Sequence, residues 1–108
     1  MKRGDIIIVA YGELGRPRPV VIVQANELGE ETKTIVACLV TSEVTEKLAI
    51  RPIVEPDEAN GLRVRSQIMT DRILAVPRER VRQVIGNVDF QTRDRLDSAL
   101  LLVLGLAR

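Results

Sequence analysis

The chain of 108 residues is long enough for one domain with a modest hydrophobic core, and near the size at which a dimer interface adds useful buried area. It has no histidine and one cysteine, which excludes imidazole acid–base chemistry, histidine-ligated metals, an intrachain disulfide and a cysteine-rich zinc site. One Tyr, one Phe and no Trp leave few aromatic platforms on which nucleic-acid bases could stack. The net charge is only +1, but residues 63–82 hold six arginines against two acids, and residues 26–60 hold eight acids against three bases. One face of the folded chain can therefore be basic.

Short runs of β-branched residues separated by turn residues predict a mainly β structure over the first two thirds of the chain. The expected strands are residues 5–9, 19–24, 34–40 and 49–54, with one or two more within 66–76, and a turn over residues 11–15. Cys38 lies inside the third run, and without a histidine to activate it we expect a buried small hydrophobe rather than a nucleophile. Pro52 cannot donate a hydrogen bond to a neighbouring strand, so the fourth strand should lie at an edge or contain a bulge. Successive strands with short connections predict an antiparallel sheet or a small barrel.

The main helix is expected near the C-terminus. Residues 77–80 fit a single helical turn, residues 84–88 fit a short strand or turn, and the helix should run from Phe90 to about Leu104 with Asp89 as its N-cap. The stripe that should face the core consists of Leu96, Ala99, Leu100 and Val103. Further apolar side chains cover the other sides of this helix, namely Leu101, Leu102, Leu104 and Leu106. This excess of apolar surface predicts a second subunit, with coverage by a long loop as the alternative.

Two arginines lie next to prolines at the start of the second strand. Pro17 and Pro19 have a fixed φ, and they bias Arg16 and Arg18 toward extended backbone. The arginine side chains therefore leave a stiff segment, and guanidinium groups bind phosphate through paired donors. A solvated strand end with incidental charge explains the same residues.

Polar side chains also occur where two apolar runs stop or are interrupted. Thr41 and Ser42 follow the third strand, where two hydroxyls can donate hydrogen bonds to a phosphoryl oxygen or can simply cap a turn. Asp71 interrupts an apolar run, and a half-buried carboxylate there should have a partner. Arg65 and Arg72 are the candidate partners, and a structural ion pair is the simplest role.

The sequence indicates neither a signal peptide nor a membrane span. The apolar run at residues 6–10 is too short for a signal-peptide core, and no stretch approaches the roughly 20 apolar residues that a membrane-spanning helix needs. We therefore expect one soluble, cytoplasmic domain over residues 1–108, without a cofactor.

The order of these features resembles the MazF/PemK family of toxin endoribonucleases, also called mRNA interferases. The motifs that carry the resemblance are KRGDI at 2–6, RPVVIVQ at 18–24, VACLVTS at 36–42, SQIMTDRI at 66–73 and IGNV at 85–88. The resemblance implies an SH3-like β-barrel of the CcdB/PemK kind with a C-terminal helix, assembled as a homodimer. It also implies metal-independent cleavage of single-stranded RNA, with inhibition of translation and growth, and neutralisation by a MazE/PemI-like antitoxin.

The resemblance implies roles for individual residues as well. Arg18 and Thr41 match the catalytic positions of the family, where attack by the ribose 2′-OH leaves a 2′,3′-cyclic phosphate and a 5′-OH. In the family the arginine that matches Arg18 transfers the proton and binds the phosphate. Arginine is an awkward general base because its pKa is very high, so we expect Arg18 chiefly to stabilise the charge of the phosphorane. The expected RNA-binding residues are Arg16, Ser42, Gln67, Asp71 and Arg72.

Two features depart from the family pattern. Residues 11–17 form a short first loop without the serine that many relatives carry ahead of the arginine. In one branch an Arg-x-Asp pair is assigned to catalysis, and here Met69 occupies the arginine position two residues before Asp71. Two alternatives remain: a gyrase-inhibiting toxin of the CcdB type, against which the absence of tryptophan counts, and an RNA-binding SH3-like module without catalysis.

Overall fold

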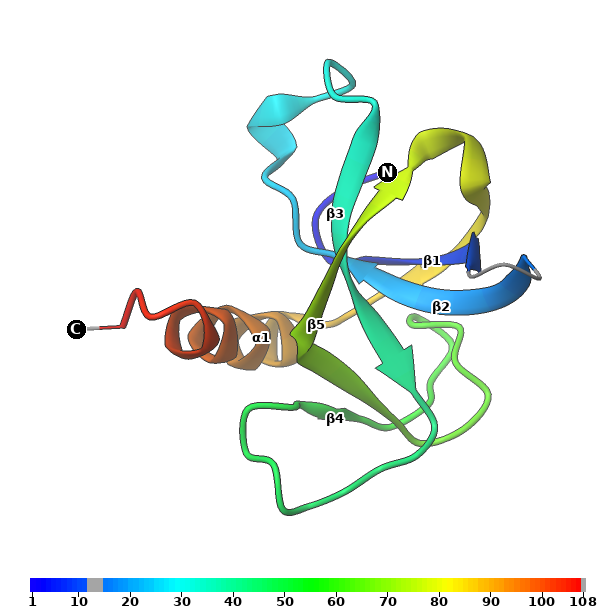
Figure 1. Cartoon of the computed structure of the whole chain (residues 1–108). Helices are drawn as coiled ribbons and strands as arrows, with labels where there is room; N and C mark the ends of the chain where they lie inside the picture. Colours follow the sequence, from blue (N-terminus) through cyan, green and yellow to red (C-terminus); the bar gives the residue numbers. More distant parts are fainter. Residues whose placement is uncertain (12–14, 108) are drawn as a thin grey trace.

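The computed structural model describes residues 1–11 and 15–107 (Figure 1). The strands are β1 (Asp5–Tyr11), β2 (Arg16–Ile22), β3 (Thr34–Thr41), β4 (Ile53–Val54), β5 (Ser66–Pro77) and β6 (Val81–Asn87). The helices are the short 3-10 turns η1 (Asn26–Leu28) and η2 (Arg78–Arg80) and the α-helix α1 (Phe90–Val103). The turn predicted over residues 11–15 falls largely on residues 12–14, which lie outside this description.

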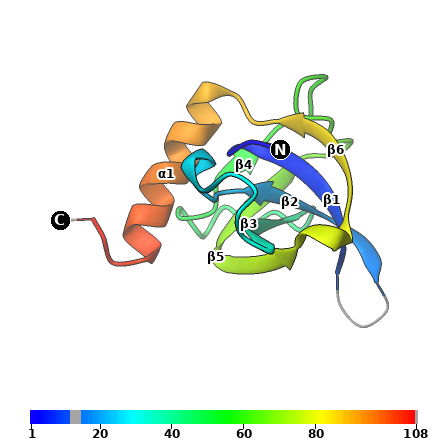
Figure 2. The same cartoon turned by 90° about the horizontal axis from the view of Figure 1, so that it is seen from above.

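The strands form one six-stranded sheet in the order β4-β5-β3-β2-β1-β6, and its neighbouring strands are antiparallel. Figures 1 and 2 show this sheet curling strongly around the core, with α1 at one side. The predicted small antiparallel barrel with a C-terminal helix is confirmed as a curled sheet of this kind. β4 lies at an edge of the sheet, as expected from Pro52, which immediately precedes it.

The loop between β4 and β5 fills the gap between the two edges of the curled sheet. The backbone N–H of Asn87 in β6 donates to the carbonyl of Ala59 at 2.9 Å. The approach requires glycine on both sides, because a Cβ on Gly86 would lie 2.2 Å from the Ala59 oxygen and one on Gly61 would lie 2.1 Å from the Ile85 oxygen. A loop therefore closes this side of the barrel and brings residues 59–62 against β6.

Apolar side chains pack on both faces of the sheet. One cluster lies between the sheet and α1 and includes Ile6, Val21, Cys38, Ile68, Leu96 and Leu100. The other lies on the opposite face and includes Ile7, Val9, Val20, Ile35, Ala37 and Val76. Burial on both faces explains why the strand sequences are continuous apolar runs rather than alternating ones. Cys38 is fully buried, and desolvation raises the pKa of its thiol to about 11, which confirms the prediction of a small core hydrophobe.

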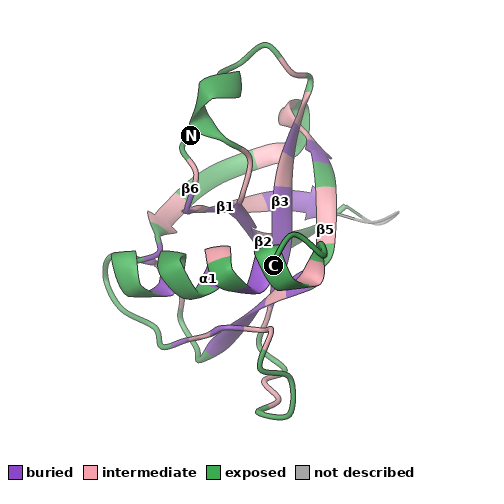
Figure 3. Ribbon diagram, turned by 90° about the vertical axis from the view of Figure 1, so that its left-hand side faces the viewer, coloured by how far each residue is buried: buried purple, intermediate pink, exposed green. Residues whose placement is uncertain are grey.

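The C-terminal helix α1 is capped by local hydrogen bonds at both ends. The carboxylate of Asp89 accepts a hydrogen bond from the backbone N–H of Thr92 at 2.8 Å, which is the predicted N-cap. Gly105, with φ of +72°, ends the helix, and Leu106 N–H donates back to the Leu101 carbonyl at 2.8 Å. The buried side of α1 consists of Thr92, Leu96, Ala99 and Leu100. Its outward surface is exposed (Figure 3), including Leu101 and Leu102.

Several strand boundaries differ from the sequence prediction, most clearly those of β2, β4 and β6. β2 begins at Arg16 rather than residue 19, because the prolines pair with β1 in extended conformation. The predicted fourth strand over 49–54 is reduced to Ile53–Val54, and residues 49–52 belong to the preceding loop. β6 extends from Val81 to Asn87, longer than the expected 84–88 segment. The single helical turn is confirmed as η2.

No helix in the described part of the chain is long and apolar enough to cross a membrane.

Candidate active site

The site begins where β2 and β3 separate. The two strands pair through Val20, Val21 and Ile22 of β2 with Leu39, Cys38 and Ala37 of β3. Pro17 and Pro19 lack an N–H, so this part of β2 can form a full ladder on one side only, and β1 takes that side. Continuing the β2–β3 register past Val20 and Leu39 places Arg18 directly across from Thr41.

The separation of the strands leaves two hollows that meet at Arg18 and Thr41. The larger one, which we name the main groove, has a volume of about 740 Å³ and runs from Arg18 and Thr41 to the loop at residues 61–64 and to Gln83 in β6. The smaller one, the side hollow, has a volume of about 290 Å³ and extends from the same two residues to Met69 and Arg72 of β5. The structure therefore brings together the two predicted catalytic residues from separate strands.

Thr41 is oriented by a hydrogen bond from the loop that follows it. Its Oγ accepts from the backbone N–H of Glu43 at 3.0 Å. A hydroxyl has two acceptor lone pairs and one donor, so this bond leaves the Thr41 proton available to a ligand in the groove. Thr41 can therefore cap the turn through its oxygen and also donate its proton to a ligand, although the sequence analysis gave these two roles as alternatives.

Positive side chains surround this junction. Arg18 lines both hollows, Arg63 lines the main groove and Arg72 lines the side hollow. Ser42 is exposed and also lines the main groove, whereas Arg16 is exposed on β2 and is not among the described residues that line either hollow. Such a surface suits an anionic ligand whose phosphate lies between Arg18 and Thr41.

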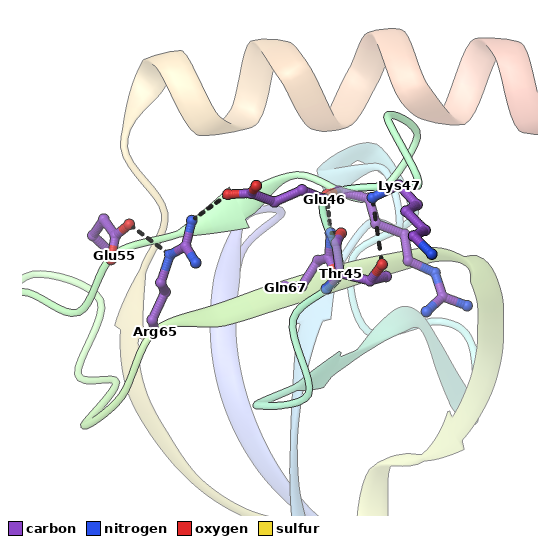
Figure 4. A network of polar contacts seen from close by, with 7 residues as sticks. Thr45, Glu46, Lys47, Glu55, Arg65 and Gln67 are labelled. Atoms are coloured by element: carbon purple, nitrogen blue, oxygen red, sulfur yellow. Dashed lines mark hydrogen bonds and ion pairs between the residues drawn. The ribbon is translucent and has the colours of Figure 1, made fainter.

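Gln67, a predicted RNA-binding residue, has a structural role in the free chain. Its side chain is only 1% exposed, and its amide is used by the loop that follows β3. Gln67 Oε1 accepts from the Thr45 N–H at 3.0 Å, and Nε2 donates to the carbonyls of Thr45 and Arg51 at 2.8 Å each (Figure 4). Gln67 therefore holds the loop over residues 45–51, which we name the anchored loop.

Asp71 has a different partner from those predicted, because Arg51 reaches it from the anchored loop. Nε and one terminal nitrogen of Arg51 donate to the two carboxylate oxygens at 2.8 and 2.9 Å. These hydrogen bonds hold the pKa of Asp71 below its ordinary value. Arg65, one of the two predicted partners, instead binds Glu55 and Glu46 (Figure 4). The Asp71 carboxylate is exposed rather than half-buried. In the free chain the Asp71 carboxylate is therefore bound by Arg51, and its contact with RNA stays a prediction.

A family profile described as the PemK-like, MazF-like toxin of type II toxin–antitoxin systems matches residues 2–104. The chain belongs to this family. The resemblance read from the sequence motifs is thereby confirmed.

Known relatives match along nearly the whole chain. The probable endoribonuclease MazF of Mycolicibacterium smegmatis is 35% identical over 109 residues, covering 99% of each chain. Endoribonuclease EndoA of Bacillus subtilis is 28% identical over 113 residues, covering 98% of this chain and 96% of the relative.

The fold matches solved structures as well. A mycobacterial endoribonuclease in complex with its cognate antitoxin superposes with a TM-score of 0.85 at 20% identity, covering 100% of this chain and 98% of the other. The MazE–MazF complex of Deinococcus radiodurans gives a TM-score of 0.78 at 15% identity, covering 99% and 98%. These likenesses show that the curled sheet with its C-terminal helix is the fold of MazF toxins.

Sequence reasoning did not single out three side chains of this PemK/MazF site. Glu43 and Gln83 belong to none of the candidate site residues, and Arg63 is one of the six arginines counted over residues 63–82. They meet in the main groove because the loop before β5 closes against β6, which is a long-range event that no local pattern encodes. The shortened first loop, the other departure from the family, includes residues 12–14 and lies partly outside the described residues.

Proposed function

We propose that this PemK/MazF-family chain is an endoribonuclease toxin that cleaves single-stranded RNA, with Arg18 and Thr41 as its catalytic residues. The observation that carries the proposal is that Arg18 of β2 and Thr41 of β3 line both hollows, at the place where these two strands stop pairing. The endoribonuclease names of the Mycolicibacterium and Bacillus relatives support the reaction class.

In this mechanism the nucleophile belongs to the substrate. The ribose 2′-oxygen attacks the adjacent phosphorus and the P–O5′ bond breaks, leaving a 2′,3′-cyclic phosphate and a 5′-OH. The Arg18 guanidinium binds the phosphoryl oxygens and neutralises the charge that develops on the phosphorane, and the Thr41 hydroxyl donates a further hydrogen bond to it. Arg16, Ser42 and Arg72 bind the flanking RNA, the last two from the walls of the two hollows. None of these steps requires a metal or a cofactor.

The proposal extends to partners and place of action. A cognate antitoxin of the MazE kind binds and neutralises the chain, in keeping with the antitoxin complexes among the matching folds. Two copies of the chain form a homodimer through the exposed side of α1. The toxin acts on mRNA in the cytoplasm, with no membrane partner, and inhibits translation and growth.

The test is cleavage of a labelled single-stranded RNA by the purified chain in EDTA, with the product ends identified. Arg18→Ala should lower the rate by at least about 10²-fold, since it removes the main charge that stabilises the transition state. Arg18 is exposed, so its loss should leave folding intact. Arg93→Ala is the matched control, because Arg93 is an exposed arginine on α1.

The outcomes separate the alternatives. Binding of RNA without cleavage would support the non-catalytic module, and binding of gyrase without action on RNA would support the CcdB-type toxin. Full activity in Arg18→Ala would overturn the site assignment.

A further inference from the structure

The proposed reaction leaves one chemical task without a residue. The 2′-OH must lose its proton as its oxygen attacks phosphorus, and a positioned base speeds such a step. Arginine stays protonated in proteins, the chain has no histidine, and the Thr41 hydroxyl is a donor to the phosphorane. The groove should therefore contain another group that accepts a proton.

Glu43 is the group that the structure places there. It lines the main groove and the side hollow, as Arg18 and Thr41 do. Among the described residues that line these two hollows, Glu43 alone carries a carboxylate. A carboxylate at this junction lies beside the position where the proposed mechanism puts the reacting phosphate.

The backbone of Glu43 is fixed although its side chain is exposed. Its N–H donates to the Thr41 Oγ, which ties it to the end of β3. Two residues further on, both backbone groups of Thr45 are bound by the buried amide of Gln67 (Figure 4). Glu43 therefore stands between two anchored points, and little backbone freedom is lost when its side chain engages a ligand.

Other carboxylates near the groove are already engaged. Asp71 is bound by Arg51, while Glu46 and Glu55 are bound by Arg65. In the part of the chain that the structure describes, Glu43 takes part in no ion pair. The other charged side chains that share its hollows are all arginines: Arg18 from β2, Arg63 from the loop before β5 and Arg72 from β5.

We propose that Glu43 is the general base of RNA cleavage, an inference that rests on the proposed function. The 2′-OH proton passes to a Glu43 carboxylate oxygen as the 2′-oxygen bonds to phosphorus. The P–O5′ bond then breaks, and the departing 5′-oxygen takes a proton from water. The Glu43 carboxylic acid returns its proton to solvent, which restores the starting state.

The experiment compares Glu43→Gln with the wild type and with Glu46→Gln as the matched control. Glutamine keeps the length of the side chain and the N–H bond to Thr41, but it cannot take up the proton. We expect kcat for single-stranded RNA to fall about 10²-fold or more in Glu43→Gln, with RNA affinity unchanged or higher because a negative charge is removed. The rise of the wild-type rate with pH on the acid side should disappear in this variant. Glu43→Asp should retain part of the rate and the pH-dependent rise, and Glu46→Gln should match the wild type.

A rate and pH profile in Glu43→Gln equal to those of the wild type would overturn the proposal. If Arg18→Ala is inactive in the same assay, that result leaves the proposed function standing and removes Glu43 alone. A wild-type chain without cleavage in EDTA would instead refute the proposed function itself.

Discussion

At the scale of single residues, Thr41 combines an observed structural hydrogen bond with the catalytic role that we propose for it. Its oxygen accepts from the Glu43 N–H, and its proton is left to face the groove. Replacing Thr41 with valine keeps the shape of the side chain but removes the hydroxyl, so it removes both hydrogen bonds together. Replacing Thr41 with serine keeps the hydroxyl and removes only the methyl group, so it serves as the control.

We expect Thr41→Val to lower kcat on the order of 10²-fold, because one hydrogen bond to the phosphorane is lost. Thr41→Ser should retain most of the wild-type rate. Steady-state cleavage of a short labelled RNA measures both values, and circular dichroism checks the fold. Equal rates in Thr41→Val and Thr41→Ser would mean that the hydroxyl does not take part.

Asp71 should make the chain lose stability in acid. Hydrogen bonds from Arg51 lower the pKa of Asp71 in the folded state, so its stabilising contribution is present above the pKa of the unfolded state, near 4. The contribution is lost as the pH falls through the lowered folded-state pKa. We expect Asp71→Asn to have a lower urea midpoint than the wild type at pH 7, and the two midpoints to converge as the pH falls through the lowered pKa of Asp71. A difference that grows as the pH falls would contradict this pairing.

At the scale of elements, two irregularities in the strands form the candidate site, one in β2 and one in β5. Prolines in β2 prevent a full ladder toward β3, which opens the sheet between Arg18 and Thr41. In β5, Cys38 pairs with Ile73 while Val40 pairs with Ile68, so β5 carries extra residues opposite this stretch of β3. These extra residues include Met69 and Arg72, which line the side hollow.

The anchored loop gives an element-scale prediction through Gln67. Gln67→Ala removes three hydrogen bonds and leaves the backbone groups of Thr45 without their partner. We expect a loss of about 2 kcal/mol in the free energy of unfolding, with faster amide hydrogen exchange over residues 42–51. Because Glu43 lies two residues before this loop and depends on its anchor at Thr45, kcat should also fall roughly tenfold or more at temperatures where the variant is fully folded.

Gln91→Ala is the control for this effect, since Gln91 is an exposed glutamine on α1. It should leave stability, exchange and kcat near their wild-type values. Faster exchange in Gln67→Ala without any loss of kcat would separate the loop from catalysis.

At the scale of the whole molecule, what could be predicted depended on how local the signal was. The apolar runs, the Asp89 cap and the stripe at Leu96 and Leu100 lie in short segments, and the structure confirms them. Motif order was enough to recognise the family, and with it the fold. The burial of Gln67 and the pairing of Asp71 with Arg51 depend on a loop whose path is set by distant contacts, so the sequence did not indicate these contacts.

The exposed side of α1 is an apolar surface that one copy of the chain does not cover. Leucines on this side are substantially exposed, with Leu102 at 61% and Leu104 at 55%. Leu102 also lines a hollow of about 350 Å³ together with Ile50 and Pro52, so the apolar surface continues from the helix onto the anchored loop and its end. Burying such a surface against a second copy removes it from water, and each large side chain so buried contributes about 1.5–3 kcal/mol.

The homodimer can be tested through these leucines without disturbing the core. We expect the wild type to sediment as a dimer at micromolar concentration, and Leu102→Glu combined with Leu104→Glu to sediment as a monomer with a retained circular dichroism spectrum, because charges at the interface would have to be buried. Leu28→Glu, which changes a leucine on η1 that is 47% exposed, should remain a dimer. A wild-type monomer at this concentration would show that the leucines of α1 are covered by something other than a second copy, and the antitoxin would then be the partner to test against the same variants.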